Sequence, residues 1–248
     1  LYGNVFNACA HLLLRKFSTN KTILEAISRI KFFVPDSMYD EYPLFLHYYP
    51  QFSHLQYKNF YYYPIDQVIS EKLHNKRCCG LNIIVGNSCS FSGNHFEIIK
   101  ILSKYKAFNR KIIFPISYAG NMRYRKKLLL YGKKMLGNSF FPITDFMSLD
   151  DYNGTILSAS IFIYNNYRQE AVGNILVALY FGGKVFLSEN NPLLYFYKSK
   201  GIIIFSISQI NEEMLSSNLD EQSQNKNREI ITNTYSTEQL YDLVRHNF

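Results

Sequence analysis

Polar side chains gather directly behind apolar runs at three places in the sequence. The first is LNIIVGNSCSFSGNH (81–95), in which Gly86 ends the run and neutral hydrogen-bonding side chains follow. These side chains are Asn87, Ser88, Asn94 and His95. Such groups bind the oxygens of phosphates and sugars, and a glycine lets a ligand approach the backbone. The segment has neither the GxGxxG fingerprint nor the Lys-Ser/Thr pair of a P-loop, so a turn that uses Gly and Asn only for its shape stays an alternative.

The other two places repeat this arrangement. SIFIYNNYRQEAVGN (160–174) carries Arg168 and Gln169 ahead of Gly173 and Asn174. KVFLSENNP (184–192) ends in Glu189, Asn190 and Asn191. The guanidinium group of arginine keeps its charge and presents a planar fork of donors, which suits phosphate oxygens. For the glutamate, a helix cap is the alternative role.

The elements that must hold these side chains alternate between strands and helices. We expect strands at 81–86, 111–115, 139–143, 160–165, 184–188 and 201–206, and helices at 94–106, 121–135, 149–159, 173–181 and 192–200. Short apolar strands that alternate with helices are typical of a doubly wound parallel sheet. In such a sheet, ligands bind beyond the carboxyl ends of the strands, where free N–H groups at the next helix start meet an anion. The three polar segments are therefore predicted to line one ligand cleft.

The sequence outside this block is less regular. Helices are expected at 7–17 and 22–30 and a strand at 31–35, whereas 42–64 has no clean period. The polar stretch 218–229 indicates a solvated helix or a linker. A terminal helix is expected at 236–248, with Ser236 or Thr237 as its cap.

Composition limits the class of protein. The chain has 248 residues, 47% of them hydrophobic, which is enough for one large domain or two smaller ones. A net charge of +8 suits nucleic acid, a phosphorylated small molecule or an anionic membrane as partner, although a proteome rich in Lys, Ile, Asn and Tyr gives the same balance. No apolar run approaches the roughly 18 residues of a membrane-spanning helix. The four cysteines form no Cys-x-x-Cys pair, which argues for reduced thiols and against a zinc or redox site; they are Cys9, Cys78, Cys79 and Cys89.

Together the polar segments resemble bacterial glycosyltransferase family 56. The family pattern has Gly-Asn-Ser after a strand and a later Asn-His, which correspond here to 86–88 and 94–95. It continues with a Pro-x-x-Tyr strand end, here Pro115 and Tyr118. An Arg-Gln…Gly helix start and a Glu-Asn-Pro segment correspond to 168–174 and 189–192. This chain departs from the pattern at Asn174, where the family has Thr, and in the additional Asn191 before Pro192.

The resemblance implies a GT-B architecture, an α/β fold in which two Rossmann-like domains face each other across a cleft. We expect residues 1–75 to be the remainder of an N-terminal, acceptor-side domain. Residues 80–217 would form the C-terminal domain that binds the nucleotide sugar, and 218–248 a linker and helix. Leu1-Tyr2-Gly3 resemble the end of a family segment, so we expect the N-terminal domain to be truncated in this chain.

The resemblance also implies a reaction. It is the inverting transfer of a dideoxy-amino sugar from a TDP-linked donor to a polyprenyl-diphosphate-linked glycan, at the cytoplasmic face of the bacterial inner membrane. The donor would contact Tyr118 and the polar residues of the three segments. No cofactor and no metal are expected: the acidic doublet Asp150-Asp151 stands at a predicted helix start, where the helix dipole favours carboxylates. The general base that inversion requires is not identified.

A basic segment suggests a membrane as a further partner. RYRKKLLLYGKK (123–134) combines six Lys and Arg residues with three leucines. A basic amphipathic helix binds the surface of an anionic bilayer, which suits a lipid-linked acceptor. HLLLRKF (11–17) is an alternative membrane-facing segment. An ordinary outer helix, with leucines inward and lysines in water, accounts for the same pattern.

Two other classes of protein compete with a glycosyltransferase. A nucleic-acid-binding module would use the positive charge and the 21 Tyr and 20 Phe, but no RNP, helix-turn-helix or zinc pattern appears. The aromatic residues cluster in 42–64 rather than alternating with Lys and Arg. A Rossmann enzyme that modifies nucleotide sugars, such as an epimerase, would carry a glycine-rich fingerprint and a Tyr-x-x-x-Lys spacing, which YFYKSK (195–200) lacks. The sequence therefore favours a glycosyltransferase that has no nucleic-acid partner.

Overall fold

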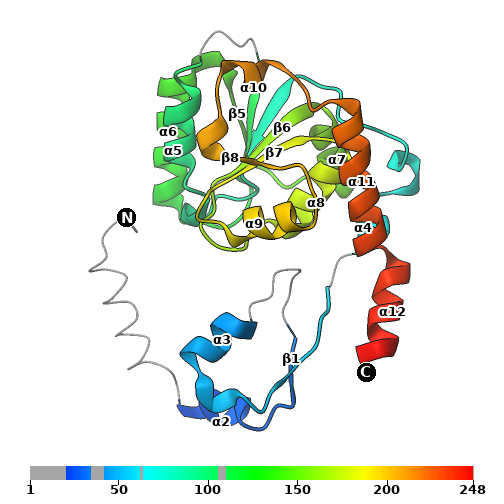
Figure 1. The fold of residues 1–248 in the computed structure, drawn as a ribbon. Coiled ribbons are helices and arrows are strands. Elements are labelled where there is room, and N and C mark those ends of the chain that lie inside the picture. The colour runs from blue at the N-terminus through cyan, green and yellow to red at the C-terminus, as the bar shows by residue number, and fades with distance from the viewer. Residues whose placement is uncertain (1–20, 35–41, 62–63, 106–109, 248) are drawn as a thin grey trace. The chain divides into compact units, whose positions relative to one another are not determined.

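The computed structural model describes residues 21–34, 42–61, 64–105 and 110–247. The chain divides into two compact units, the first ending at Phe60 and the second running from Tyr61 to His246 (Figure 1). Three features of the sequence lie outside the described residues and stay predictions: Cys9, the expected helix at 7–17 with its membrane-facing segment, and Leu1-Tyr2-Gly3.

The first unit is small and rich in aromatic side chains. Its elements are α2 (Lys21–Ile27), β1 (Phe32–Phe33), α3 (Tyr42–Tyr48), the 3-10 helix η1 (Pro50–Phe52) and β2 (Gln56–Tyr57); β1 and β2 pair in parallel. Phe45 packs against Phe33 with 4.8 Å between ring centroids, and Phe52 is buried beside it. Short elements that share aromatic rings explain why 42–64 shows no clean period. The predicted helix at 22–30 and strand at 31–35 are confirmed in shortened form.

The second unit is built on a six-stranded sheet in the order β5-β4-β3-β6-β7-β8. The strands are β3 (Asn82–Val85), β4 (Ile112–Pro115), β5 (Phe140–Ile143), β6 (Ala159–Tyr164), β7 (Lys184–Leu187) and β8 (Phe205–Ser206). Every neighbouring pair is parallel. All of β6 is buried, as expected for a strand that is covered on both faces. The predicted α/β fold with a doubly wound parallel sheet is confirmed.

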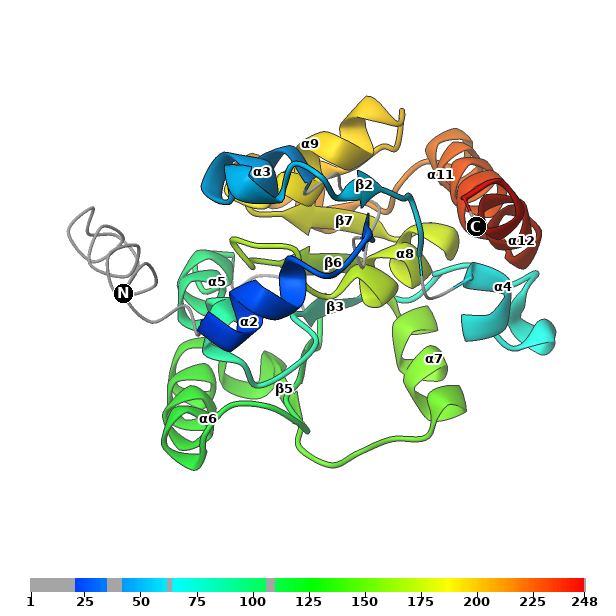
Figure 2. The same cartoon turned by 90° about the horizontal axis from the view of Figure 1, so that it is seen from below.

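Helices cover both faces of this sheet (Figure 2). One face carries α5 (His95–Leu102) and α6 (Met122–Leu136); the other carries α7 (Leu149–Leu157), α8 (Val172–Tyr180) and α11 (Glu221–Tyr235). The unit also contains α4 (Ile65–Val68), α9 (Pro192–Ser199), α10 (Glu212–Ser216), α12 (Thr237–Asn247) and the 3-10 helices η2 (Glu71–Leu73), η3 (Phe91–Gly93), η4 (Gly137–Ser139) and η5 (Ile207–Gln209). Within the described ranges, no helix is both long enough and apolar enough to cross a membrane.

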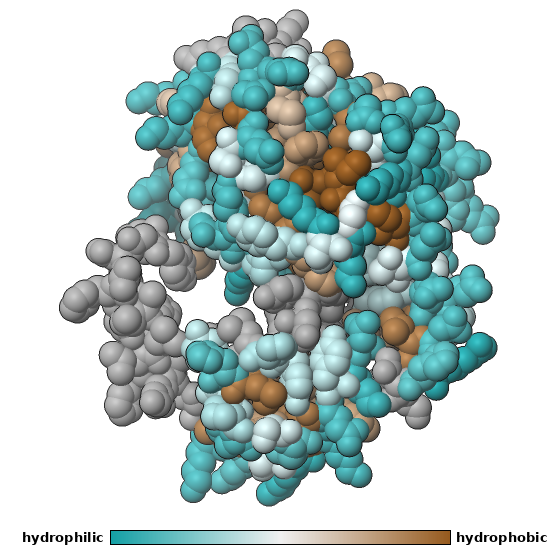
Figure 3. Space-filling view, viewed as in Figure 1, coloured by the Kyte–Doolittle hydropathy of each residue, from teal (hydrophilic) through white to brown (hydrophobic). Residues whose placement is uncertain are grey.

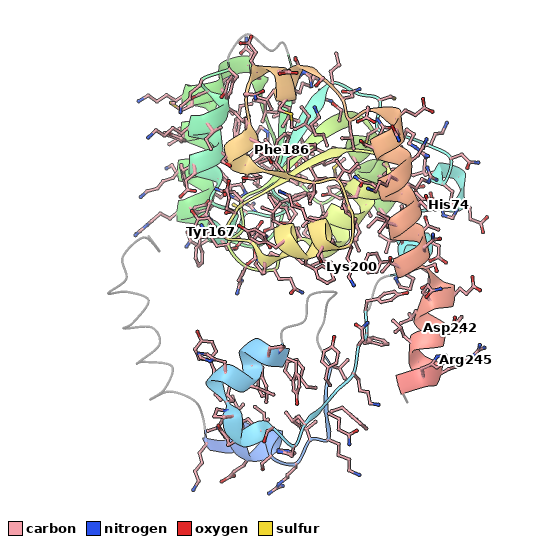
Figure 4. The ribbon with its side chains drawn as sticks, in the orientation of Figure 1. His74, Tyr167, Phe186, Lys200, Asp242 and Arg245 are labelled. Atoms are coloured by element: carbon pink, nitrogen blue, oxygen red, sulfur yellow. The ribbon has the colours of Figure 1, made fainter. Side chains whose placement is uncertain are left out.

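Buried aromatic and branched side chains hold the sheet and its helices together. Phe114, Phe162 and Phe186, from three different strands, are each 0% exposed; Figure 4 labels Phe186 near the centre of the unit. Ile98 of α5 and Leu128 of α6 cover the strands from one side and are also fully buried. Each such side chain contributes about 1.5–3 kcal/mol relative to exposure. This core fixes the carboxyl edge of the sheet, on which the polar segments lie.

The C-terminal segment belongs to the second unit, whereas the sequence suggested a separate linker and helix from residue 218. Helix α11 packs against α8. The fully buried side chain of Asn227 accepts a hydrogen bond from the Ile203 N–H and donates one to the Ile203 carbonyl oxygen. These bonds occupy backbone groups of Ile203, and the strand predicted at 201–206 is reduced to Phe205–Ser206. Only a narrow stripe of α11 is buried, so its sequence is as polar as that of a linker.

The second unit also begins earlier than the boundary expected at residues 75–80. The Tyr61 hydroxyl donates to the Ser236 carbonyl oxygen at 2.6 Å, and the Cys78 N–H donates to the Phe181 carbonyl oxygen at 2.8 Å. Residues 61–75, which the sequence assigned to the N-terminal domain, therefore lie with the sheet. Of the two expected caps of α12, it is Ser236 whose Oγ accepts a helix N–H, that of Gln239.

Candidate functional site

The strand order creates a crevice between two elbows. The chain runs from β3 outward to β4 and β5 and then returns to place β6 on the other side of β3. The segments that follow β3 and β6 therefore lead to opposite sides of the sheet, and ligands of such sheets bind where this reversal occurs. We call residues 86–94 the first elbow and residues 165–171 the second elbow.

The first elbow is a tight turn made by residues that tolerate unusual backbone angles. Gly86 and Asn94 have positive φ angles, 69° and 47°. A Cβ atom at Gly86 would lie 2.9 Å from Nε2 of His95, so the position excludes side chains on steric grounds as well. Asn87 donates to the Tyr118 hydroxyl at 3.0 Å, which links the elbow to the end of β4. Ser88 is buried and its Oγ accepts the Ser90 N–H, so this side chain shapes the turn.

The second elbow is tied to the first by carboxylates and amides. Oε2 of Glu170 accepts hydrogen bonds from the Ser92 hydroxyl at 2.7 Å and from Nδ2 of Asn166 at 2.5 Å. The other oxygen of Glu170 pairs with Nε of Arg168. Asn94 donates across the crevice to the Asn165 carbonyl oxygen at 2.8 Å. The two elbows are thus one hydrogen-bonded structure at the predicted place.

Two helices that begin at this crevice carry no side-chain cap. The other helices of eight or more residues in the described part of the second unit begin under side-chain oxygens, which accept an N–H of the first turn; these belong to Asn121, Ser148, Asn191, Asp220 and Ser236. In α5 the residue in the cap position, Asn94, turns its amide to the second elbow instead, and in α8 this position is Ala171. Their first N–H groups stay available, and each helix start carries about half a positive charge.

Gly173 and Asn174 lie in the first turn of α8, as predicted. Nothing lies within 4 Å of the place where a Cβ of Gly173 would be, so its backbone faces open space. Oδ1 of Asn174 accepts a hydrogen bond from the Tyr152 hydroxyl at 2.7 Å. Burial raises the pKa of Tyr152, which keeps this hydroxyl protonated as a donor.

A cavity of about 300 Å³ opens beside these residues at the carboxyl ends of β4 and β5. Asn87, Tyr118 and Asn174 line it together with apolar and aromatic side chains, among them Phe146, Met147 and Tyr152. The rings of Tyr118 and Phe146 stack with 5.9 Å between centroids and 30° between planes. The cavity therefore offers aromatic faces with a few amides, which is typical of sites for flat heterocyclic ligands.

His95 lies beneath the first elbow, although the sequence suggested direct contact with a ligand. It is 0% exposed, and its Nδ1 lies 2.9 Å from the Tyr124 hydroxyl of α6. Burial lowers the pKa of the imidazole to about 4, although the Ser88 backbone acts in the opposite direction. The neutral ring fills the space that Gly86 and Gly93 leave free, so it supports the shape of the elbow from below.

The polar residues of the third segment, 184–192, have different roles. Asn191 is buried and caps α9 by accepting the Leu193 N–H at 3.0 Å. Glu189 accepts from the Ser206 hydroxyl and from the Ser208 N–H, so it binds the start of η5 and not that of α9. Burial alone would raise the pKa of this carboxyl, but these hydrogen bonds outweigh it and lower the pKa to about 2. Asn190 is exposed at the same edge.

Several buried polar atoms in these segments have no hydrogen-bond partner within the described residues. They are Nε2 of His95, Oδ1 of Asn166, Oε1 of Gln169 and Nδ2 of Asn191. Unsatisfied buried polar atoms are few in native proteins and call for an explanation such as a functional role. Here they belong to the three polar segments that the sequence singled out.

The sequence missed residues that form the junction itself: Ser92, Glu97, Asn165, Asn166 and Glu170. Asn165 and Asn166 stand directly behind β6, where the pair of amides could have been noticed, but the bonds of Glu170 to the first elbow depend on tertiary contact. The doublet Asp150-Asp151 lies in the first turn of α7, as expected, and Asp150 pairs with Lys72. Across the described ranges, no group of three or more His, Cys, Asp or Glu side chains is arranged to hold a metal ion.

Comparison with known structures identifies the fold. The chain aligns with a glycosyltransferase from Rickettsia africae ESF-5 over 92% of its length, at 14% identity and a TM-score of 0.65. It aligns with a chain of the GtfA/B complex and with TarM over 91% of its length, at 8% and 14% identity and a TM-score of 0.61 in both cases. It covers 65%, 46% and 45% of these three chains, respectively. The fold is that of the GT-B glycosyltransferases.

The family follows from the sequence. The model of the family described as 4-alpha-L-fucosyltransferase, glycosyl transferase group 56, matches residues 44–239. This chain belongs to glycosyltransferase family 56, and the resemblance stated above is confirmed.

Proposed function

We propose that the second unit binds the nucleoside diphosphate of a sugar donor in the crevice between the two elbows. The complete protein would be an inverting transferase that moves a dideoxy-amino sugar from a TDP-linked donor to a polyprenyl-diphosphate-linked glycan. Family membership supports sugar transfer from an activated donor. The donor, the acceptor and the stereochemical outcome rest on the resemblance of the motifs.

The observation that carries the proposal is the pair of uncapped helix starts beside Arg168. Both α5 and α8 begin at the crevice without a side-chain cap, and the guanidinium group adds a permanent positive charge. A diphosphate is the ligand that fits two helix dipoles and one arginine, because it carries charge on several oxygens. The same groups would stabilise the leaving diphosphate when the bond to the sugar breaks.

The nucleoside is assigned to the cavity beside the crevice. Tyr118 and Phe146 present aromatic faces to a base, and Asn87 and Asn174 supply amides at the side nearest the elbows. In the transfer step, an acceptor hydroxyl attacks the anomeric carbon from the face opposite the diphosphate. The bond between that carbon and the phosphate oxygen breaks, and a base takes the hydroxyl proton. We assign no metal and no cofactor to this step.

Replacing the arginine tests the site. Arg168→Ala is expected to weaken binding of TDP and UDP about 10- to 100-fold, because a charge-assisted hydrogen bond contributes about 1.5–3 kcal/mol. Isothermal titration calorimetry of wild type and Arg168→Ala with each nucleotide would measure the loss of affinity. Arg77→Ala is the matched control, since it removes the same charge from the opposite edge of the sheet, where Arg77 donates to Asn225. Equal affinities of Arg168→Ala and wild type would show that the diphosphate binds elsewhere.

We also propose peripheral contact with an anionic membrane, at the cytoplasmic face of the bacterial inner membrane, through the outer face of α6. Leu128 and Gly132 face the core. The residues on the opposite side are exposed: Arg123, Lys126, Lys127, Leu130, Lys133 and Lys134. Leu130 is 65% exposed, whereas an ordinary outer helix would turn its leucines toward the core. The sequence of α6 also contains no acidic residue. Figure 3 shows hydrophilic residues along this margin of the unit.

Charge reversal on α6 tests the contact. The pair Lys126→Glu and Lys127→Glu is expected to reduce binding to vesicles containing phosphatidylglycerol tenfold or more, because each cation near such a surface contributes about 1 kcal/mol. Binding to neutral phosphatidylcholine vesicles should be weak for all variants. The pair Lys198→Glu and Lys200→Glu, at the C-terminal end of α9, changes the net charge equally and should bind as wild type. An equal loss for both pairs would mean that net charge, not this face, decides binding.

A further inference from the structure

We infer that Glu170 is a positioning residue that sets the orientation of Arg168, so that the two terminal nitrogens of the guanidinium group point to a diphosphate. The inference rests on the proposed diphosphate site. Tyr167, the residue directly before Arg168 in the second elbow, marks the location in Figure 4.

The carboxylate of Glu170 is itself held rigidly. Its side chain is only 19% exposed, and Oε2 accepts from Ser92 of the first elbow and from Asn166 of the second. Asn166 is 1% exposed, and its Nδ2 also donates to the Ser92 carbonyl oxygen at 3.4 Å. The Ser92 hydroxyl and the Asn166 amide therefore hold Oε2 of Glu170 in place. Because the carboxylate is planar, the position of Oε1 is fixed as well.

That second oxygen binds Arg168 at one atom. Oε1 pairs with Nε, and within the described residues the structure gives the two terminal nitrogens no hydrogen-bond partner. The arginine side chain is 77% exposed and without this pair would sample many rotamers. A guanidinium group held at Nε keeps its end-on pair of donors free for bidentate contact with phosphate oxygens.

Electrostatics and positioning make opposite predictions for loss of the carboxylate. A negative charge next to a diphosphate repels it, so if charge alone mattered, Glu170→Ala would bind TDP more tightly. If Glu170 orients Arg168, Glu170→Ala binds TDP more weakly, and the loss requires Arg168. Glu170→Gln removes the repulsion and keeps one oxygen, which can accept from Nε of Arg168 or from Ser92 and Asn166 but not from both, so it loses less affinity than Glu170→Ala.

A double-mutant cycle with TDP as the probe tests the inference by calorimetry on the full chain. We expect Glu170→Ala to weaken TDP binding about tenfold, Glu170→Gln to weaken it less than Glu170→Ala does, and the Glu170→Ala, Arg168→Ala double variant to bind no more weakly than Arg168→Ala. Glu97→Ala is the comparison variant: Glu97 accepts from Asn165 and Tyr167 of the second elbow, but it does not contact the arginine. Any change it makes in TDP affinity should be the same with and without Arg168, which separates orientation of the arginine from general support of the elbow.

Three results would overturn the inference. They are tighter or unchanged binding by Glu170→Ala, additive losses in the double variant, and a loss in Glu97→Ala that likewise requires Arg168. In each case a loss of affinity in Arg168→Ala alone would leave the proposed diphosphate site standing. If Arg168→Ala itself binds TDP as wild type does, the proposed site is wrong and the inference falls with it.

Discussion

Ser117→Trp is expected to weaken TDP and UDP binding about 100-fold while leaving binding of pyrophosphate unchanged. Ser117 lines the cavity of about 300 Å³ beside Tyr118, and an indole would occupy the space assigned to the nucleoside. The arginine and the start of α5 do not line that space, and Asn174 is the only first-turn residue of α8 that does, so a ligand that lacks a nucleoside should still bind. A factor of 100 corresponds to about 2.7 kcal/mol. Isothermal titration calorimetry with each ligand in turn would measure both affinities.

A second cavity provides the control for this variant. It has about 320 Å³, lies where β3 and β4 begin, and is lined by Leu102, Met135 and Leu215 among others, with Ser139 at its wall. Ser139→Trp fills this cavity at the opposite edge of the sheet and should bind TDP as wild type does. If Ser117→Trp keeps its nucleotide affinity and its fold, the nucleoside does not occupy the aromatic cavity.

The buried imidazole of His95 is expected to make the second unit sensitive to acid. In an unfolded chain the pKa of histidine is about 6.5, and burial lowers it to about 4 in the folded protein. Between these values the unfolded chain binds a proton that the folded chain does not, so the free energy of unfolding falls as the pH falls from about 6.5 to about 4. At about 1.4 kcal/mol per pH unit, the loss from this group is about 3 kcal/mol.

Comparison with His95→Gln isolates this contribution. We expect the variant to be less stable than wild type at pH 7.5, because it disturbs the packing beneath Gly86 and Gly93. The difference should shrink by about 3 kcal/mol at pH 4, since the variant has no imidazole to protonate. Urea unfolding at both values measures the two differences. Parallel pH profiles of the two proteins would contradict the burial of a neutral ring.

The sequence predicted the sheet and its polar edge because both depend on local patterns. Apolar runs such as 160–165 alternate with helices, and the elements that follow β3, β6 and β7 begin within a few residues of their predicted positions. The carboxyl ends of parallel strands share one edge, so topology alone brought Asn87, Arg168 and Asn174 to the same region. Chain order and periodicity are enough for that inference.

The details that decide each side chain's role are tertiary, and sequence reasoning did not reach them. His95 and Glu189 carry the right groups at the right edge, but the first is covered by the elbow and the second is occupied by η5. Glu170 escaped notice because its partners, Ser92 and Asn166, are known only once β3 and β6 are paired. For 218–229 the sequence left a solvated helix and a linker open; the structure has a helix, and its docking through the single buried Asn227 depends on tertiary contact.

The junction of the elbows has a consequence for how the protein is made. Asn94 and Asn165 are 71 residues apart in the chain, and Ser92 and Glu170 are 78 apart. A nascent chain on the ribosome therefore has no complete crevice until β6 has emerged and paired with β3. This pairing comes late and closes a long loop of chain, which costs conformational entropy. A ligand that bridges the elbows adds its binding free energy to that pairing. A protease that nicked the exposed loop at 144–148 would cut the polypeptide between the elbows, and bound nucleotide would then help to hold the two fragments together.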